Sequence, residues 1–330
     1  MRSEPPPPPP FDPELGQALA AMRPEERKPV TPEGLAAWQA RDAAARPRPT
    51  VRDLAAEGRF EVTELGLPAS GASDGRTIRL VVARPSGSRE PLPVLYYMHG
   101  GGMITGNAWS VLPRLLREWA EPLRLAVVSV DYRLAPQTRY PGPVEDCYAG
   151  LVLATEDAAG LGLDPDRVIV AGKSAGGGLA AALALLTRDR GGPTPLGQVL
   201  MSPMLDDRGD SFSSHQMAGH DIWDRTSNAT AWQALLGDRY RAADLSPHAA
   251  PARAADLSAL PAAYVDVGSA ETFRDEAVAY ANGIWQAGGD AELHVWPGAF
   301  HGYDTFAPHA VLSHDAREAR TRWLRRILGR

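Results

Sequence analysis

Segments typical of β-strands alternate with segments of helical periodicity from about residue 59 onward, and this alternation constrains the fold more than any other feature. Several central strand segments are apolar without interruption, which is typical of strands that helices cover on both faces. The alternation predicts an α/β protein with a mostly parallel, doubly wound sheet. The predicted strands are 60–65, 78–83, 94–98, 126–130, 168–171, 198–202, 263–267 and 291–296, and the predicted helices are 111–119, 144–158, 177–187, 273–287 and 310–328.

Two segments fall outside this alternation. Residues 1–56 begin with a proline run at 5–10, which predicts a stiff extended tail, and continue with short helices separated by prolines at 24, 29 and 32. Residues 206–256 contain no evident strand, and an insertion of this length in a compact domain is typical of a lid or a binding element. We therefore expect the main domain to span 57–330, with a helical cap formed by 1–56 and 206–256.

Composition excludes several classes of protein. The 330 residues are 44% hydrophobic and 22% charged, as in ordinary globular proteins, and a net charge of −6 gives no support for a nucleic-acid partner. Cys147 is the single cysteine, so no intrachain disulfide can form, and its place in a predicted helix favours packing over catalysis. The absence of a signal-like apolar stretch and of any apolar stretch long enough to span a membrane predicts a cytoplasmic protein.

The strongest chemical signal is Gly172-Lys173-Ser174-Ala175-Gly176, which lies between a predicted strand and a predicted helix. A serine between two glycines at such a turn is typical of a nucleophile elbow, in which the hydroxyl stands clear of the sheet. The motif alone is weak, because glycine-rich packing turns are common between strands and helices. Ser174 is nevertheless the leading candidate for a covalent nucleophile, and its partners must be sought elsewhere in the sequence.

Two nucleotide-binding motifs that resemble this turn do not fit. A P-loop requires glycine five residues before Gly172, where Arg167 stands. A dinucleotide-binding fingerprint beginning at Gly172 requires glycine at position 174, where the serine stands.

A serine nucleophile needs backbone donors for the oxyanion and a base for its proton. The loop His99-Gly100-Gly101-Gly102 directly follows the strand predicted at 94–98, and its glycines expose backbone amides; shaping the turn is the simplest role for His99. Among eight histidines, His301 follows the last predicted strand and so lies at the carboxyl edge of the sheet, where sites of open α/β folds form. We therefore predict His301 as the base.

The acid that orients this base should follow the strand predicted at 263–267, because the order in such folds is serine, acid, histidine. Glu271 lies in the loop after that strand, whereas Asp275 and Glu276 fall in the first turn of a helix, where the helix dipole also favours acidic residues. Glu271 is therefore the preferred candidate.

Together these motifs resemble the hormone-sensitive-lipase-like (bacterial family IV) esterases of the α/β-hydrolase superfamily. The resemblance extends from about Val94 to the C-terminus and rests on the following ordered motifs: His99-Gly100-Gly101-Gly102, Asp131-Tyr132-Arg133-Leu134-Ala135-Pro136, Tyr140-Pro141, Asp146, Gly172 to Gly177, Ser202-Pro203, Arg274-Asp275-Glu276 and His301-Gly302. It implies an α/β-hydrolase fold, a Ser174 nucleophile, a His301 base, and oxyanion donors at the amides of Gly101, Gly102 and Ala175. It also implies that no metal or organic cofactor is needed, and it allows a homodimer.

Three positions depart from the pattern of that family. Glu271 stands where the family usually has the catalytic aspartate, Lys173 where it has an acidic residue, and Gln137 where it has glutamate. Glutamate is one methylene longer but can still orient an imidazole. Because both other changes remove negative charge near the elbow, we hypothesise that Lys173 and Gln137 are coupled.

The sequence thus predicts a serine carboxylesterase with a Ser174–His301–Glu271 triad, and the resemblance implies short- to medium-chain acyl esters as small-molecule substrates. A deacetylase or an amidase that acts on a secondary metabolite through the same site is the first alternative. A non-catalytic receptor on a hydrolase fold is the alternative from another class, and it is disfavoured because all three triad positions carry competent residues.

Overall fold

One eight-stranded sheet forms the centre of the computed structural model, which describes residues 6–23, 25, 27–46, 48–69 and 76–330. Residues 1–5, which include the first proline of the run predicted at 5–10, and the proline at 24 lie outside the described residues. The strands are β1 (Phe60–Pro68), β2 (Thr77–Pro85), β3 (Leu92–Met98), β4 (Ala126–Asp131), β5 (Leu163–Lys173), β6 (Gly197–Met201), β7 (Ala262–Gly268) and β8 (Ala291–Trp296). They follow the order β1-β2-β4-β3-β5-β6-β7-β8.

The sheet is parallel from β4 to β8, and only the β1–β2 and β2–β4 pairs are antiparallel. The prediction of a mostly parallel eight-stranded sheet is therefore confirmed. The largest difference lies in β5, which begins at Leu163 rather than at 168. Residues 164–167 are charged or proline, so they carry no apolar signal. Leu163 nevertheless pairs with Leu92, across a register shift, and so begins the strand.

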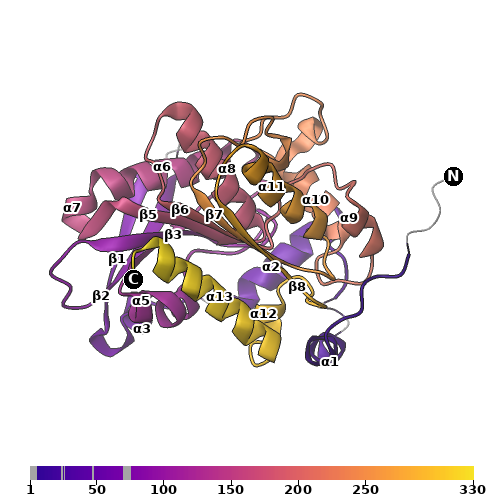
Figure 1. Cartoon of the computed structure of the whole chain (residues 1–330), viewed down its shortest axis with the longest axis horizontal. Helices are drawn as coiled ribbons and strands as arrows, with labels where there is room; N and C mark the ends of the chain where they lie inside the picture. Colours follow the sequence, from indigo (N-terminus) through magenta and orange to yellow (C-terminus); the bar gives the residue numbers. More distant parts are fainter. Residues whose placement is uncertain (1–5, 24, 26, 47, 70–75) are drawn as a thin grey trace.

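Helices cover both faces of the sheet (Figure 1). On one face lie α6 (Gly142–Glu156), α7 (Ala158–Leu161), α8 (Ala175–Arg190) and α11 (Arg274–Gln286); on the other lie α4 (Leu112–Leu115), the π-helical segment η3 (Leu116–Ala120), α5 (Glu121–Leu123) and α13 (Val311–Ile327). Successive residues of β5 alternate between the two apolar layers: Val168 and Val170 join the first, Ile169 and Ala171 the second. This alternation explains why the central strands are apolar without interruption.

The remaining described helices lie in the two segments outside the strand and helix alternation, except for one short helix between β8 and α13. The described part of the N-terminal segment contains α1 (Pro13–Ala21), α2 (Leu35–Ala45) and α3 (Val51–Leu54), followed by the short turn η2 (Ala56–Gly58). The insertion contains α9 (Phe212–Gln216), α10 (Arg225–Leu236), η4 (Gly237–Arg239) and η5 (Pro251–Arg253), and α12 (Tyr303–Phe306) precedes α13. Within the described ranges, no helix is long and apolar enough to cross a membrane.

The helices of the N-terminal segment pack against different parts of the protein. Asp12 caps α1 by accepting hydrogen bonds from the backbone amides of Glu14 and Leu15, and α1 then packs its buried Leu15 and Leu19 against the apolar cluster that contains Phe300. Helix α2 lies elsewhere, against the insertion, as the separation of α1 and α2 in Figure 1 shows. The two ends of the N-terminal segment therefore support different parts of the molecule.

Candidate active site

The predicted elbow is a tight turn between β5 and α8. Ser174 directly follows the strand and precedes the helix with φ 58° and ψ −123°, a conformation with positive φ that costs a residue with a side chain about 1–3 kcal/mol. A Cβ added to Gly172 would overlap the carbonyl of Gly176, and one added to Gly176 would overlap the carbonyl of Met98. Both flanking residues must therefore be glycine, because backbone segments meet there at van der Waals distance.

His301 lies in the loop after β8, and its Nε2 is 3.0 Å from the Oγ of Ser174. The two residues are 127 positions apart in the sequence. Both are largely buried, and the imidazole and the ring of Phe273 pack nearly perpendicular to each other at a centroid distance of 5.1 Å. This separation of Oγ and Nε2 is within the range over which an imidazole can take a proton from a serine hydroxyl.

Glu271 lies on the other side of the imidazole and is fully buried. Its Oε1 is 3.5 Å from Nδ1 of His301, which is longer than a hydrogen bond of normal length. Its other oxygen, Oε2, accepts hydrogen bonds from the hydroxyl of Ser202 at 2.9 Å and from the amide of Gly268 at 3.4 Å. The carboxylate is therefore held in place from the side opposite the imidazole.

Ser202 is a supporting residue whose role could not be predicted from the sequence. It follows β6 with a positive φ of 43°, and its amide donates to the carbonyl of Asp266, which directs its hydroxyl toward Glu271. The only signal was the Ser202-Pro203 pair, which the sequence offered as a family motif without a function. The other two carboxylates considered as the acid are engaged elsewhere: Asp275 accepts from the amide of Ser213, and Glu276 accepts from the amide of Leu205.

The glycine loop after β3 approaches the elbow closely. A Cβ on Gly100 would lie 2.9 Å from the carbonyl oxygen of Lys173 and 3.5 Å from the Cβ of Ser174. The next two residues, Gly101 and Gly102, have φ values of 117° and 63°, which residues with side chains rarely adopt. This conformation turns the loop beside the serine hydroxyl and brings its backbone near the first turn of α8, which begins at Ala175.

His99 is a buried structural residue of this loop. Its ring stacks on Tyr132 at a centroid distance of 4.2 Å, and the hydroxyl of Tyr132 donates to the carbonyl of His99 at 2.7 Å. Burial lowers the pKa of His99 to about 4, so the ring is neutral at ordinary pH. These contacts fix the start of the glycine loop.

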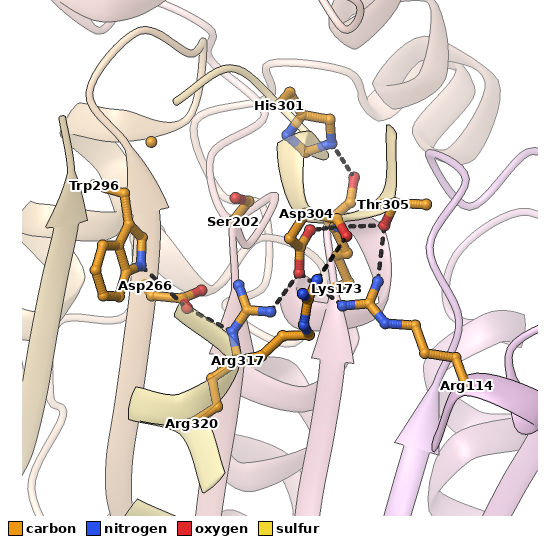
Figure 2. Close-up of polar contacts among 12 residues, drawn as sticks. Arg114, Lys173, Ser202, Asp266, Trp296, His301, Asp304, Thr305, Arg317 and Arg320 are labelled. Atoms are coloured by element: carbon orange, nitrogen blue, oxygen red, sulfur yellow. Dashed lines mark hydrogen bonds and ion pairs between the residues drawn. The ribbon is translucent and has the colours of Figure 1, made fainter. Parts of the chain in front are cut away.

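A cluster of buried and partly buried charged side chains lies near the serine and the histidine. We call it the Asp304 cluster, and its members are Lys173, Arg114, Arg320, Asp304 and Asp266. Figure 2 shows Lys173, Arg114 and Arg320 converging on the carboxylate of Asp304. Both Lys173 and Arg320 form ion pairs with it, Arg114 approaches it at 2.9 Å, and Arg320 also reaches Asp266 at 2.6 Å. Burial alone would raise the pKa of Asp304, but the three cations hold it well below its usual value.

The Asp304 cluster joins the elbow to the histidine loop, since Lys173 directly precedes Ser174 and Asp304 lies three residues after His301. The sequence identified Lys173 as unusual but gave no indication of its partner. That partner is Asp304, so the charge of Lys173 is balanced without a contribution from Gln137. The coupling between Lys173 and Gln137 stays a hypothesis.

The insertion and helix α2 meet beside the glycine loop. The rings of Trp38 and Trp223 lie 6.2 Å apart, and a Cβ on Gly102 would lie 2.5 Å from the Trp223 ring. The side-chain amide of Gln39 donates to the carbonyls of Ile104 at 2.7 Å and of Ala135 at 3.1 Å. Helix α2 and the insertion therefore both contact the region that the sequence predicted as the oxyanion loop.

Known proteins resemble this chain over most of its length. A family model described as alpha/beta hydrolase fold matches residues 95–305. The carboxylesterase NlhH of Mycobacterium tuberculosis (strain CDC 1551 / Oshkosh) is 40% identical over 243 residues, which span 71% of this chain and 74% of that protein. An acetyl-hydrolase of Streptomyces hygroscopicus is 30% identical over 294 residues, which span 88% of this chain and 93% of that protein.

The fold is also close to that of a solved esterase structure. The bacterial heroin esterase superposes with a TM-score of 0.84 at 36% sequence identity, covering 96% of this chain and 98% of that chain.

Proposed function

The chain belongs to the alpha/beta hydrolase fold family, in its hormone-sensitive-lipase-like branch, and is a carboxylesterase; we propose that it acts through a triad of Ser174, His301 and Glu271. The observation that carries the proposal is the 3.0 Å separation of Ser174 Oγ from His301 Nε2 at a strained elbow. Strain at a non-glycine residue persists only where the surrounding structure enforces it, which is typical of catalytic positions.

In the first half of the reaction, Nε2 of His301 takes the hydroxyl proton of Ser174 while Oγ attacks the ester carbonyl carbon. The carbonyl π electrons move to oxygen and form a tetrahedral oxyanion. When the oxyanion collapses, the bond to the alcohol oxygen breaks, and the imidazolium gives its proton to that oxygen. The products of this half-reaction are the free alcohol and an ester between the acyl group and Ser174.

The second half repeats these steps with water. His301 takes a proton from water, the resulting hydroxide attacks the acyl carbonyl, and the imidazolium returns the proton to Oγ as the carboxylic acid leaves. Glu271 does not accept this proton. Its buried carboxylate stabilises the imidazolium that forms in each half and keeps Nδ1 directed away from the serine.

The backbone amides of Gly101, Gly102 and Ala175 are the proposed oxyanion donors. The close approach of the glycine loop to Ser174 supports this role, as does the place of Ala175 at the first position of α8, where an amide has no partner within its own helix. Losing one such donor typically raises the barrier by about 3–4 kcal/mol.

We further propose that helix α2 and the insertion 206–256 form a cap over the acyl pocket, whereas α1 packs against the cluster that contains Phe300. The contacts of Trp38 with Trp223 and of Gln39 with Ile104 support this assignment, because they place both segments against the glycine loop. A cap of this kind limits the length of the acyl chain, which supports short- to medium-chain esters as substrates. The similarity to an acetyl-hydrolase supports the short end of this range.

Steady-state hydrolysis of p-nitrophenyl acetate, butyrate and palmitate by the purified protein tests this proposal. We expect kcat/KM for acetate and butyrate to exceed that for palmitate by about tenfold or more, because each poorly accommodated group on the substrate lowers transition-state binding. Hydrolysis of p-nitroacetanilide at a comparable rate would instead favour the amidase alternative. The absence of hydrolysis of any of these compounds by folded protein would contradict the proposal.

A further inference from the structure

The insertion residues 221–223 contact three loops around the proposed triad. These are the loop that carries His301, the glycine loop and the loop that carries Glu271. The carboxylate of Asp221 lies against the backbone amide of His301. The ring of Trp223 packs over Gly102 of the glycine loop, and the carbonyl of Trp223 accepts a hydrogen bond of 2.8 Å from the hydroxyl of Thr272, the neighbour of Glu271. No motif in the sequence drew attention to Asp221.

Asp221 is a buried carboxylate with an exposed fraction of only 5%. The amide of His301 donates to its Oδ1 at 3.1 Å and to its Oδ2 at 3.3 Å, and the amide of Ile222 donates to Oδ1 at 2.7 Å. The charges that act on it most strongly are those of His301 and Glu271. Glu271 therefore lies beside the imidazole, while Asp221 holds the backbone of the same residue and interacts with it electrostatically.

Two effects of Asp221 on His301 follow from this geometry. Its hydrogen bonds fix the backbone at position 301, and a fixed backbone limits the orientations of the imidazole between Ser174 and Glu271. Its negative charge in a poorly solvated site favours the imidazolium over the neutral imidazole. Burial raises the pKa of Asp221 to about 7, and the charge of Glu271 acts in the same direction, so Asp221 ionises in the pH range in which an imidazole also titrates.

We propose that Asp221 is a positioning residue for the esterase reaction, which holds His301 through its backbone amide and adds a second negative charge that stabilises the imidazolium. This proposal rests on the proposed triad. A carboxylate that served only to anchor the insertion would supply the same hydrogen bonds, but the protonation of the imidazole would not depend on its charge. The two roles can therefore be separated by removing the charge while keeping an acceptor oxygen.

Asp221→Asn makes this change with little alteration of volume. Among the described residues, the polar groups that face His301 are Ser174, Glu271 and Asp221. In the variant, Glu271 is the one carboxylate left in this set. With p-nitrophenyl butyrate we expect kcat to fall about tenfold or more, because the imidazole is less well oriented and its cation less well stabilised, with KM within about twofold. We also expect the acidic limb of the kcat/KM pH profile to move to lower pH by about half a unit or more.

Asp224→Asn is the matched control, because Asp224 lies in the same segment, is similarly buried and caps α10 by accepting from the amide of Ser227 at 2.9 Å. We expect this variant to stay close to wild type in stability, because asparagine caps a helix about as well as aspartate, and to leave the position of the acidic limb unchanged. Glu271→Gln serves as the reference for a triad residue and should reduce kcat more strongly than Asp221→Asn does.

An unchanged kcat and an unchanged acidic limb in folded Asp221→Asn would overturn the proposal for Asp221 and leave the triad intact. If Asp221→Asn does not fold, Asp221→Glu decides, since it retains the charge: an acidic limb at the wild-type position supports the proposal, and a limb moved to lower pH overturns it. Failure of the triad itself would appear differently, as ester hydrolysis that survives Ser174→Ala.

Discussion

Replacing Ser174 by alanine is expected to lower kcat for p-nitrophenyl butyrate by about 10⁴- to 10⁶-fold, which is the loss typical of removing a serine nucleophile. The reason is that the substitution removes the hydroxyl that lies 3.0 Å from His301 Nε2 at the elbow. The fold should persist, because an alanine side chain fits the same turn and the lost hydroxyl donates only to the imidazole. The free energy of unfolding should change by less than about 1 kcal/mol.

Ser129→Ala is the matched control for this experiment. Ser129 is a buried serine of β4 whose hydroxyl donates to the carbonyl of Ala108 at 3.0 Å, away from the triad. Its removal should cost about 1 kcal/mol of stability, as for a typical hydrogen bond, and should leave kcat within about twofold of wild type. Retention of more than about one hundredth of wild-type kcat by Ser174→Ala would contradict the proposed mechanism.

Replacing Asp304 by asparagine is expected to lower the free energy of unfolding at pH 7 by about 3–5 kcal/mol. Asp304 is 1% exposed and is the carboxylate on which Lys173, Arg114 and Arg320 converge, so its loss leaves three poorly solvated cations around a neutral amide. Because Lys173 precedes Ser174, the same change should also loosen the elbow relative to the histidine loop and reduce kcat. Urea unfolding monitored by tryptophan fluorescence measures the first effect.

The pH dependence provides an independent check of the Asp304 prediction. The neighbouring cations hold the pKa of Asp304 well below 3.8, so its carboxylate contributes stability above the unfolded-state pKa and loses it as the pH falls through the folded-state value. The difference in the free energy of unfolding between wild type and Asp304→Asn should therefore be largest at pH 7 and should become smaller below about pH 4.

Asp244→Asn supplies the control for a surface ion pair. Asp244 has a side chain that is 78% exposed and lies 3.2 Å from Arg239, so its replacement should change stability by less than about 0.5 kcal/mol. A similarly small effect of Asp304→Asn at pH 7 would show that the Asp304 cluster does not hold the two loops together.

The strands, the elbow and the order of the site residues could be predicted because each depends on local sequence or on chain order. Uninterrupted apolar runs identified the central strands, and the carboxyl ends of parallel strands necessarily meet at one edge of the sheet. For this reason Ser174, Glu271 and His301, which follow β5, β7 and β8, could be expected to converge although 127 residues separate the first from the last.

The missed residues depend on contacts that no local pattern encodes. Asp221 lies in an insertion without periodicity, and its partner is a backbone amide 80 residues away. Asp304 lies in the short helix α12 and acquires its role from Lys173 of β5, 131 residues earlier. The helices of the insertion were also not predicted, because α10 packs its buried Ala231 and Trp232 among polar neighbours such as Asn228.

The central claim is that Ser174 is the nucleophile, and covalent labelling tests it most directly. Treatment with p-nitrophenyl diethyl phosphate should transfer one diethylphosphoryl group to Oγ of Ser174, release one p-nitrophenolate and abolish ester hydrolysis in proportion to labelling. Peptide mass spectrometry should locate the group on Ser174 alone, and Ser174→Ala should take up none. Inactivation with the label on another residue, or full labelling of Ser174 without loss of activity, would contradict the mechanism.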